Sequence, residues 1–328
     1  MNRNESLYSL AHAGVVDLAI VGGGATGLGV ALDAALRGYS VALLESHDFA
    51  GGTSSRSTKL LHGGVRYLAQ GNVSLVREAL HERQSILAIA PHLAAPLSFV
   101  MPAYAWWKLP FYTIGLKLYD LLAGRAGLGA TEWLSRRETA QALPGVQVRG
   151  LHGGVKYWDA QFDDARLALA IARTARAAGA NVLNHVKVAN LQALEGQSDG
   201  AKWALDWQNQ KGVEQGVLRA KCVVNAAGVW VDDVLAKVNG HVPTRRMVTP
   251  SQGVHLVVDR RFLAGKSALL VPKTTDGRVL FAVPWLGSLI LGTTDTVRDD
   301  APREPLPLEE EIDFILREAA HVLADAPQ

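Results

Sequence analysis

A chain of 328 residues, 48% hydrophobic and 20% charged, can bury a large core, which excludes an intrinsically disordered protein. Its 33 basic and 31 acidic residues give a formal net charge of +2, which argues against a nucleic-acid-binding protein with its basic excess. The single cysteine, Cys222, excludes an intramolecular disulfide and a cysteine-based metal cluster, and we expect a buried thiol on a strand.

No segment of the sequence is predicted to be a transmembrane helix, which would need about 20 consecutive apolar residues. The most apolar stretch, residues 18–36, is interrupted by glycines and contains Asp33. Residues 1–14 lack the cationic start, apolar run and cleavage site of a secretory signal, and we expect them to be a loose leader. These features predict a cytoplasmic protein and leave a place on a membrane surface open.

Residues 16–45, VDLAIVGGGATGLGVALDAALRGYSVALLE, combine the parts of a dinucleotide-binding unit in order. The apolar run at residues 18–21 predicts a buried strand, and the spacing of apolar residues over 28–36 predicts a helix. A second strand is expected at residues 40–44. Glu45 stands at its end, 23 residues after Gly22.

Each part of this unit has a physical role. Gly22 permits a tight turn, Gly24 lets a pyrophosphate approach the backbone, and Gly27 lets the helix pack closely on the strand. The helix start favours a phosphate through its dipole and free N–H groups, and Glu45 can accept hydrogen bonds from ribose hydroxyls. The full order favours a dinucleotide site over an ordinary glycine-rich turn. NAD and FAD both use this unit.

The next stretch, SHDFAGGTSSRSTKLLHGGVRYL at residues 46–68, shows little apolar periodicity. An NAD-dependent dehydrogenase would continue with further strand–helix units, so that reading is the least favoured. A glycine- and hydroxyl-rich segment suits an extended flavin, whereas a polar surface loop would not need its apolar residues. The residues expected to hold the FAD pyrophosphate are Thr53, Ser54 and Ser55 with the preceding glycines. Those expected beside the isoalloxazine ring are Ser57, Thr58, Lys59, Gly63 and Gly64.

Several segments then agree with one family in order. SSRSTKLLHGGVRYL at residues 54–68 resembles the stretch that marks flavin-dependent glycerol-3-phosphate dehydrogenases, which belong with D-amino-acid oxidase and glycine oxidase to a larger group of FAD oxidoreductases. Further agreement is found in DDARL (163–167), VVNAAGVW (223–230), SQGVHLVV (251–258) and LGTTDT (291–296). The resemblance extends from Asp17 to about Asp300.

The resemblance implies an α/β fold with a Rossmann-like FAD-binding domain and an intertwined antiparallel-sheet substrate domain, as in D-amino-acid oxidase. We expect the FAD-binding domain at residues 15–93 and 151–240, the substrate domain at 94–150 and 241–305, and the start of a helical region at 306–328. Small residues at Ala227 and Gly228 would again let the backbone approach the cofactor.

The implied reaction is the oxidation of sn-glycerol 3-phosphate to dihydroxyacetone phosphate, with FAD taking the hydride. Arg66 would bind the substrate phosphate, although a structural ion pair is nearly as good a reading of that residue alone, and Tyr67 would orient a substrate oxygen. A histidine within an apolar strand is usually a core residue, but the matching family position lines the substrate site, so His255 is the candidate general base. His62 is an alternative base or a flavin contact. Thr293, Thr294 and Asp295 would support the pocket, and Lys59 has a surface role as its alternative.

Residues 105–124, AWWKLPFYTIGLKLYDLLAG, combine aromatic side chains with lysines. The pattern alone favours a helix with its aromatics packed in the core over a helix at a membrane interface. The resemblance shifts this toward peripheral contact with the inner face of the cell membrane, because bacterial members pass electrons to quinone there.

The remaining pattern predicts helices at residues 74–90, 163–179 and 306–324, strands at 182–188, 201–208 and 217–225, and short strands over 241–296. No histidine spacing predicts a metal site. Relatives continue beyond residue 328 with segments for the substrate phosphate and for closing the FAD site, so the chain is expected to be truncated. Two alternatives therefore stay open: an amino-acid- or amine-oxidising relative of the same fold, and a non-catalytic FAD-binding fragment. Quinone and oxygen both stay open as electron acceptors.

Overall fold

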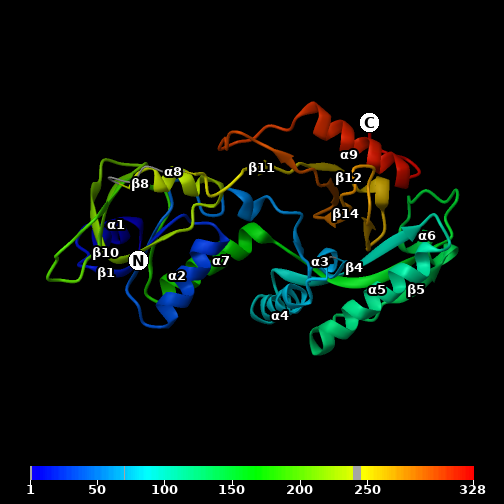
Figure 1. Ribbon diagram of the computed structural model, residues 1–328, viewed down its shortest axis with the longest axis horizontal. Coiled ribbons are helices and arrows are strands. Elements are labelled where there is room, and N and C mark those ends of the chain that lie inside the picture. Colours follow the sequence, from blue (N-terminus) through cyan, green and yellow to red (C-terminus); the bar gives the residue numbers. More distant parts are fainter. Residues whose placement is uncertain (1, 70, 239–244) are drawn as a thin grey trace. The chain divides into compact units, whose positions relative to one another are not determined.

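The computed structural model describes residues 2–69, 71–238 and 245–328. The chain forms two compact units, each built from separate stretches (Figure 1). The first unit comprises Met1–Ser57, Asp164–Pro250 and Arg298–Arg303, and the second comprises Thr58–Asp163, Ser251–Val297 and Glu304–Gln328. Residues 58–93, which we expected in the cofactor domain, fold with the second unit. There Leu60, Val76 and Leu80 share one hydrophobic cluster with strand residues such as Phe99 and Val155.

A six-stranded sheet forms the centre of the first unit, in the order β7-β2-β1-β10-β9-β8. Four neighbouring strands are parallel: β7 (Asn181–Leu183), β2 (Val41–Leu44), β1 (Val16–Val21) and β10 (Gln215–Asn225). The strands β9 (Trp203–Asn209) and β8 (Val186–Ala193) continue it in antiparallel pairing. The single strand predicted over residues 182–188 is thus two strands, because the chain turns at His185, where φ is +51°.

Both faces of this sheet are covered. On one face, α2 (Ala25–Leu36) and α7 (Asp164–Ala177) pack together, with Ile20, Leu28 and Ala172 in their common cluster (Figure 1). The other face includes α1 (Arg3–Ala11), which buries Leu7 and Leu10. The prediction of a loose leader at residues 1–14 was therefore wrong. The side chain of Asn2 caps this helix, and its apolar residues cover the sheet.

Cys222 lies on a strand as predicted, but its side chain is exposed and not buried. The antiparallel neighbour β9 pairs with β10 only as far as Ala220, so that side of β10 is open at Cys222. Apolar alternation along the strand could not reveal where the neighbouring strand ends.

The second unit contains an eight-stranded sheet whose pairs are antiparallel except where β13 runs parallel to β4. This agrees with the expected sheet, with that one exception. Its strands in spatial order are β12 (His255–Asp259), β15 (Ser288–Gly292), β14 (Leu280–Trp285), β13 (Ala268–Val271), β4 (Ala94–Ala103), β6 (Gly153–Phe162) and β3 (Leu60–Leu61), with β5 (Glu132–Ser135) also paired to β6. A separate pair is formed by β11 (Ser251–Gln252) and β16 (Thr296–Val297).

Helices also cover this second sheet. One cluster joins it to α3 (Val65–Ala69), α4 (Val73–Ile89) and α5 (Lys108–Ala123). This cluster contains Leu80, and in it the ring of Tyr119 contacts that of Tyr157 edge to face. Another cluster joins it to α9 (Glu309–Val322) through Ile315 and Ala319. The remaining short elements are α6 (Arg136–Ala142), α8 (Val231–Leu235), η1 (Thr53–Ser55), η2 (Gly124–Ala126), η3 (Gly228–Trp230) and η4 (Arg260–Leu263).

Residues 105–124 bury only some of their aromatic side chains, whereas the pattern alone had favoured packing in the core. Tyr119 is in the core and Tyr112 packs against it. Trp106 and Trp107, just before α5, and Phe111 within it are exposed by 71%, 58% and 71%. Nothing in the spacing of the aromatic residues could show which side of the helix meets the sheet. Within the described residues, no helix is both long and apolar enough to cross a membrane.

Candidate functional site

The glycine turn of the first unit follows β1 at the edge where β2 and β10 also end, because these strands are parallel and in register. Gly22 has a φ of +111°, and a Cβ there would lie 2.5 Å from the carbonyl oxygen of Ala226. A Cβ on Gly27 would collide with the carbonyl oxygen of Gly22. Only glycine fits these two positions, as the sequence predicted for a turn whose backbone approaches a pyrophosphate.

Glu45 is fixed beside this turn. Its Oε2 accepts a hydrogen bond from the Gly23 N–H at 2.7 Å, and its Oε1 accepts one from the His47 N–H at 2.7 Å. A carboxylate held in this way keeps further lone pairs for ribose hydroxyls. The predicted position of the acid next to the phosphate-binding turn is therefore present.

Gly24 is the N-cap residue of α2 and has no side chain to cap the helix. Ser54 supplies that cap from η1: its Oγ accepts the Ala25 N–H at 2.9 Å. A Cβ on Gly24 would lie 3.0 Å from the same Oγ. Thus the hydroxyl-rich segment and the positive end of a helix dipole meet at one place, which suits an anionic group such as a pyrophosphate.

Ser57 has an internal role that the sequence did not reveal. Its N–H and its hydroxyl both donate to Oδ2 of Asp164, at 3.2 and 2.7 Å, and Asp164 is buried at the start of α7. This anchors the end of the 53–57 segment to a helix distant in sequence. From the sequence, DDARL was noted for its agreement with the family and lies at the start of the helix predicted at residues 163–179.

Ala227 and Gly228 lie in the turn after β10, where Gly228 has a φ of +60°. Asn225 holds this turn: its Oδ1 accepts the Ala227 N–H at 3.3 Å, and its Nδ2 donates to the Val231 carbonyl at 2.9 Å. Ala226 of this turn lies against Gly22, so the turn after β10 and the glycine turn after β1 are neighbours. The approach of a cofactor to Ala227 and Gly228 stays a prediction. Asn225 was in the quoted motif, but nothing in its neighbours marked it as the residue that holds the turn.

The sequence did not predict that Trp230 and Arg303 lie beside Gly51 and Gly52 in the first unit. The ring of Trp230 lies where a Cβ on Gly52 would come within 3.1 Å, and its indole N–H donates to the Ala301 carbonyl at 2.8 Å. The Arg303 guanidinium lies over the Trp230 ring, 5.4 Å from its centroid. Arg303 lies outside every motif quoted from the sequence, and its place beside Trp230 depends on the folded chain.

In the second unit, His255 is the first residue of β12 and pairs with Gly292 of β15. Its Nε2 lies 2.8 Å from the Thr58 hydroxyl. A Cβ on Gly292 would lie 2.6 Å from the imidazole Cδ2, so glycine is required for this ring position. Burial, with a smaller effect of the Lys59 charge, lowers the pKa of His255. A neutral, partly buried imidazole can accept a proton, as a general base must.

Thr294 supports the chain next to His255, as expected of the LGTTDT segment. Its hydroxyl accepts the Val254 N–H at 3.0 Å and donates to Oε1 of Glu311 at 3.1 Å. Glu311 is 2% exposed and also accepts from Thr296 and Gln252. Burial raises its pKa, but these hydrogen bonds and the one from the Leu308 N–H outweigh burial and hold the pKa below its usual value. From the sequence, Glu311 was only one position of the helix predicted at residues 306–324.

His62 and Tyr67 are both exposed in the second unit, Tyr67 by 38%. Arg66 lies between them on α3, and its side chain is outside the part of the chain that is described. Gly64 has a φ of +78°, and a Cβ there would lie 2.8 Å from Cδ2 of Tyr67. A Cβ on Gly63 would collide with the Tyr119 hydroxyl. Packing within the unit thus requires both glycines, whereas the sequence had suggested only a flat ring against them.

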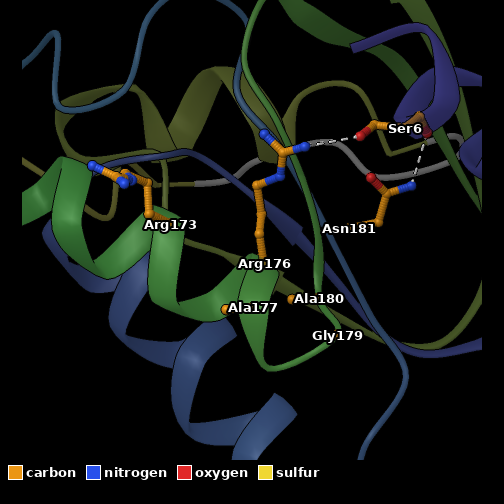
Figure 2. A pocket seen from close by; sticks show the side chains of 7 residues that line it. All are labelled: Ser6, Arg173, Arg176, Ala177, Gly179, Ala180 and Asn181. Atoms are coloured by element: carbon orange, nitrogen blue, oxygen red, sulfur yellow. Dashed lines mark hydrogen bonds between the residues drawn. The ribbon is translucent and has the colours of Figure 1, made fainter. Parts of the chain in front are cut away.

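A hollow of about 330 Å³ in the first unit lies away from the glycine turn (Figure 2). It is lined by Ser6, Arg173, Arg176, Ala177, Gly179, Ala180 and Asn181. Asn181 begins β7, so the hollow is at the amino ends of the parallel strands, while Gly22 is at their carboxyl ends. Among the described residues, no group of three or more His, Cys, Asp or Glu side chains is arranged to hold a metal ion.

The family model described as "FAD dependent oxidoreductase" matches residues 17–328. The chain belongs to this family. Its members use FAD, and the predicted fold class and cofactor are confirmed.

Within this family, the chain is similar in sequence to glycerol-3-phosphate dehydrogenases. Mitochondrial glycerol-3-phosphate dehydrogenase of Macaca fascicularis is 44% identical over 333 residues, covering 98% of this chain and 45% of the relative. The Saccharomyces cerevisiae protein of the same name is 38% identical over 354 residues, covering 98% and 54%. The chain therefore spans about half the length of the curated relatives it matches.

Solved structures agree with this. The glycerol-3-phosphate dehydrogenase of Bacillus halodurans, complexed with FAD, has a TM-score of 0.77 and 32% identity, covering 99% of this chain and 56% of that one. Glycine oxidase of Geobacillus kaustophilus has a TM-score of 0.62 at 21% identity, covering 94% and 78%. The second likeness concerns the fold alone.

Proposed function

We propose that this chain carries the FAD-binding and proton-accepting parts of a glycerol-3-phosphate dehydrogenase, which oxidises sn-glycerol 3-phosphate to dihydroxyacetone phosphate. The observation that carries the proposal is the 44% identity over 98% of the chain with a protein of that name. The glycine turn, Glu45 and the partly buried hydrogen bond of His255 support the proposal on chemical grounds.

The first unit suits the adenosine and pyrophosphate parts of FAD, because Gly22 and Gly27 let the turn pack backbone against backbone, where a Cβ would collide with a carbonyl oxygen. Glu45 would accept the ribose hydroxyls, and the start of α2 with Ser54 would face the pyrophosphate. The full proposed set in this unit is Gly22, Gly24, Gly27, Glu45, Thr53, Ser54, Ser55, Ser57, Ala227 and Gly228. In the second unit, we propose Thr58, Lys59, His62, Gly63 and Gly64 as flavin contacts.

The chemistry at the substrate needs two events at C2, loss of a hydride and loss of the hydroxyl proton. Bound FAD supplies the hydride acceptor. We assign the proton to His255, whose lowered pKa keeps the imidazole ready to accept it at neutral pH. The Thr58 hydroxyl at 2.8 Å holds the ring in place. Arg66 is proposed to bind the substrate phosphate, and Tyr67 to orient a substrate oxygen.

The exposed side of α5 is proposed to contact the membrane from the cytoplasmic side, where a quinone would accept the electrons. Trp107, Phe111, Ile114, Leu118 and Leu121 recur at helical spacing and are exposed by 58%, 71%, 70%, 46% and 76%. Spacing of this kind places them on one side of the helix. Lys108 and Lys117 on the same helix provide positive charge for anionic headgroups.

The test of the main proposal is anaerobic absorbance of the purified chain and of a form extended to the length of its relatives. Loss of the oxidised flavin band after adding glycerol 3-phosphate, but not after adding glycine or proline, is the expected result. Bleaching by the amino acids instead would point to an amine-oxidising enzyme. A bound flavin that stays oxidised in both forms would overturn the assigned reaction and leave the FAD site standing.

A further inference from the structure

A buried ion pair lies within the hydrophobic cluster of the second unit. Nη1 of Arg83, on α4, is 2.8 Å from Oδ1 of Asp159, on β6, and both side chains are 2% exposed. Their surroundings include Leu80, Tyr119 and Tyr157. Desolvation makes such a pair costly, and apolar residues of similar volume are often as stable. Stability alone therefore does not account for the pair.

The pair converges on one backbone group. Both carboxylate oxygens of Asp159 accept the N–H of Gly63, at 3.1 and 3.2 Å, and the Tyr119 hydroxyl donates to Oδ2 at 3.3 Å. The second nitrogen of Arg83, Nη2, donates to the Ala126 carbonyl at 2.8 Å. Burial, together with the Asp159 charge, raises the pKa of Tyr119, so the phenol remains a donor at all working pH values.

The turn is held by contact as well as by hydrogen bonds. A Cβ on Gly63 would lie 2.5 Å from Cδ2 of Leu80 and would collide with the Tyr119 hydroxyl. The helices that carry these side chains, α4 and α5, pack together on the second unit (Figure 1). Gly63 therefore has one position available, between His62 and the start of α3.

We propose that Asp159 is a positioning residue that fixes the His62–Tyr67 segment through the Gly63 N–H, with Arg83 and Tyr119 holding its carboxylate. The consequence for catalysis rests on the proposed function, because His62, Arg66 and Tyr67 are assigned to flavin or substrate there. The hydrogen bonds of Asp159 with Gly63, Arg83 and Tyr119, called the Asp159 clamp below, lie entirely in the second unit. It gives the buried pair a role in geometry, which a purely stabilising pair would not have.

The test replaces the pair by apolar residues, Arg83→Met with Asp159→Leu, so that no unpaired charge is left in the core. The matched control is Lys156→Met with Glu132→Leu, which removes an exposed ion pair that also involves β6. Hydrogen–deuterium exchange is followed in the peptide covering residues 60–69. The expected result is exchange faster by about tenfold or more in that peptide alone, and no change in the control. The melting temperature of the double variant should fall, because the buried Gly63 N–H and Tyr119 hydroxyl lose their acceptor.

Two further readouts separate this proposal from the assigned reaction. In a form extended to the length of its relatives, kcat with glycerol 3-phosphate is expected to fall about 100-fold, as for a misplaced catalytic segment. If wild type does not oxidise glycerol 3-phosphate, the exchange result still decides the Asp159 clamp. Unchanged exchange at 60–69 in a folded double variant overturns it. If the double variant does not fold, Tyr119→Phe is used, and unchanged exchange there has the same meaning.

Discussion

At Gly22 the backbone has a φ of +111° and lies against the Ala226 carbonyl. Gly22→Ala is therefore expected to lower the free energy of unfolding by about 1–3 kcal/mol and to weaken FAD binding, because the added methyl strains the turn. Urea unfolding and a flavin fluorescence titration measure the two effects.

The helix that follows this turn, α2, offers a matched control. A Cβ on Gly29, inside α2, would meet nothing within 4 Å. Gly29→Ala should raise the free energy of unfolding by about 0.5–1 kcal/mol, because alanine is the better helix former. Equal effects of the two substitutions would contradict the strained-turn explanation.

His255 allows a prediction for pH dependence. Burial lowers its pKa in the folded protein, so the unfolded chain binds the proton more readily. The contribution of His255 to stability is then fully present above the unfolded pKa of about 6.5 and is lost as pH falls below it. His255→Gln should flatten the fall in the free energy of unfolding between about pH 6.5 and 5, measured by urea unfolding. A variant with the same slope as wild type would show that His255 does not titrate in this range.

The same substitution tests the assigned base. His255→Gln should slow flavin reduction by glycerol 3-phosphate by about 10²–10⁴-fold while FAD affinity stays near wild type. Stopped-flow absorbance measures the rate of flavin reduction in the form extended to the length of its relatives. A change in substrate affinity with an unchanged rate of reduction would assign His255 to binding and not to proton transfer.

At the scale of single elements, α9 depends on Glu311, which accepts hydrogen bonds from the Leu308 N–H and from the side chains of Gln252, Thr294 and Thr296. Glu311→Ala should lower the free energy of unfolding by about 1–3 kcal/mol, because these buried donors lose their partner. Glu310→Ala is the control on the same helical turn, since Glu310 is exposed. Thermal and urea unfolding of both variants decide between a buried network and a simple helix-dipole effect, which would make the two losses similar.

The element α5 provides the test of membrane contact. Phe111→Ser with Leu121→Ser removes two exposed side chains and should leave the fold intact. Sedimentation with vesicles containing phosphatidylglycerol should show affinity reduced about tenfold or more, given about 1.5–3 kcal/mol for burying each such side chain. Val213→Ser with Leu286→Ser, at sites exposed by 96% and 84%, should bind like wild type. Equal binding of both double variants would remove the membrane from the proposal.

Local features of these elements are predictable from the sequence, whereas their tertiary contacts are not. Local order predicts the turn at Gly22 and the helix after it, because strand, glycines and helix are contiguous. It cannot predict that Asp159 accepts the Gly63 N–H, since the partners are 96 residues apart and neither stands out in its own segment. The face that α5 exposes and the end of β9 beside Cys222 depend likewise on tertiary neighbours.

At the scale of the whole molecule, the chain returns to the first unit after Asp163 and to the second after Pro250. The proposed FAD residues are accordingly spread over separate stretches of sequence, while each stretch is fixed within its own unit. In the first unit, Gly22 meets Ala226, and Ala25 is capped by Ser54. A cofactor that contacts these stretches should slow their exchange together, although no single peptide contains the site.

Hydrogen–deuterium exchange with and without FAD tests this distribution. Addition of FAD to the flavin-free protein should protect peptides covering residues 22–28, 45–55 and 225–229 of the first unit, since bound ligand stabilises what it contacts. NADH at the same concentration is the control and should protect none of them. Protection of residues 58–67 would support the proposed flavin contacts of the second unit. Protection confined to the first unit would restrict the cofactor site to the glycine turn and Glu45, and the roles given to Thr58, Lys59 and His62 would have to be withdrawn.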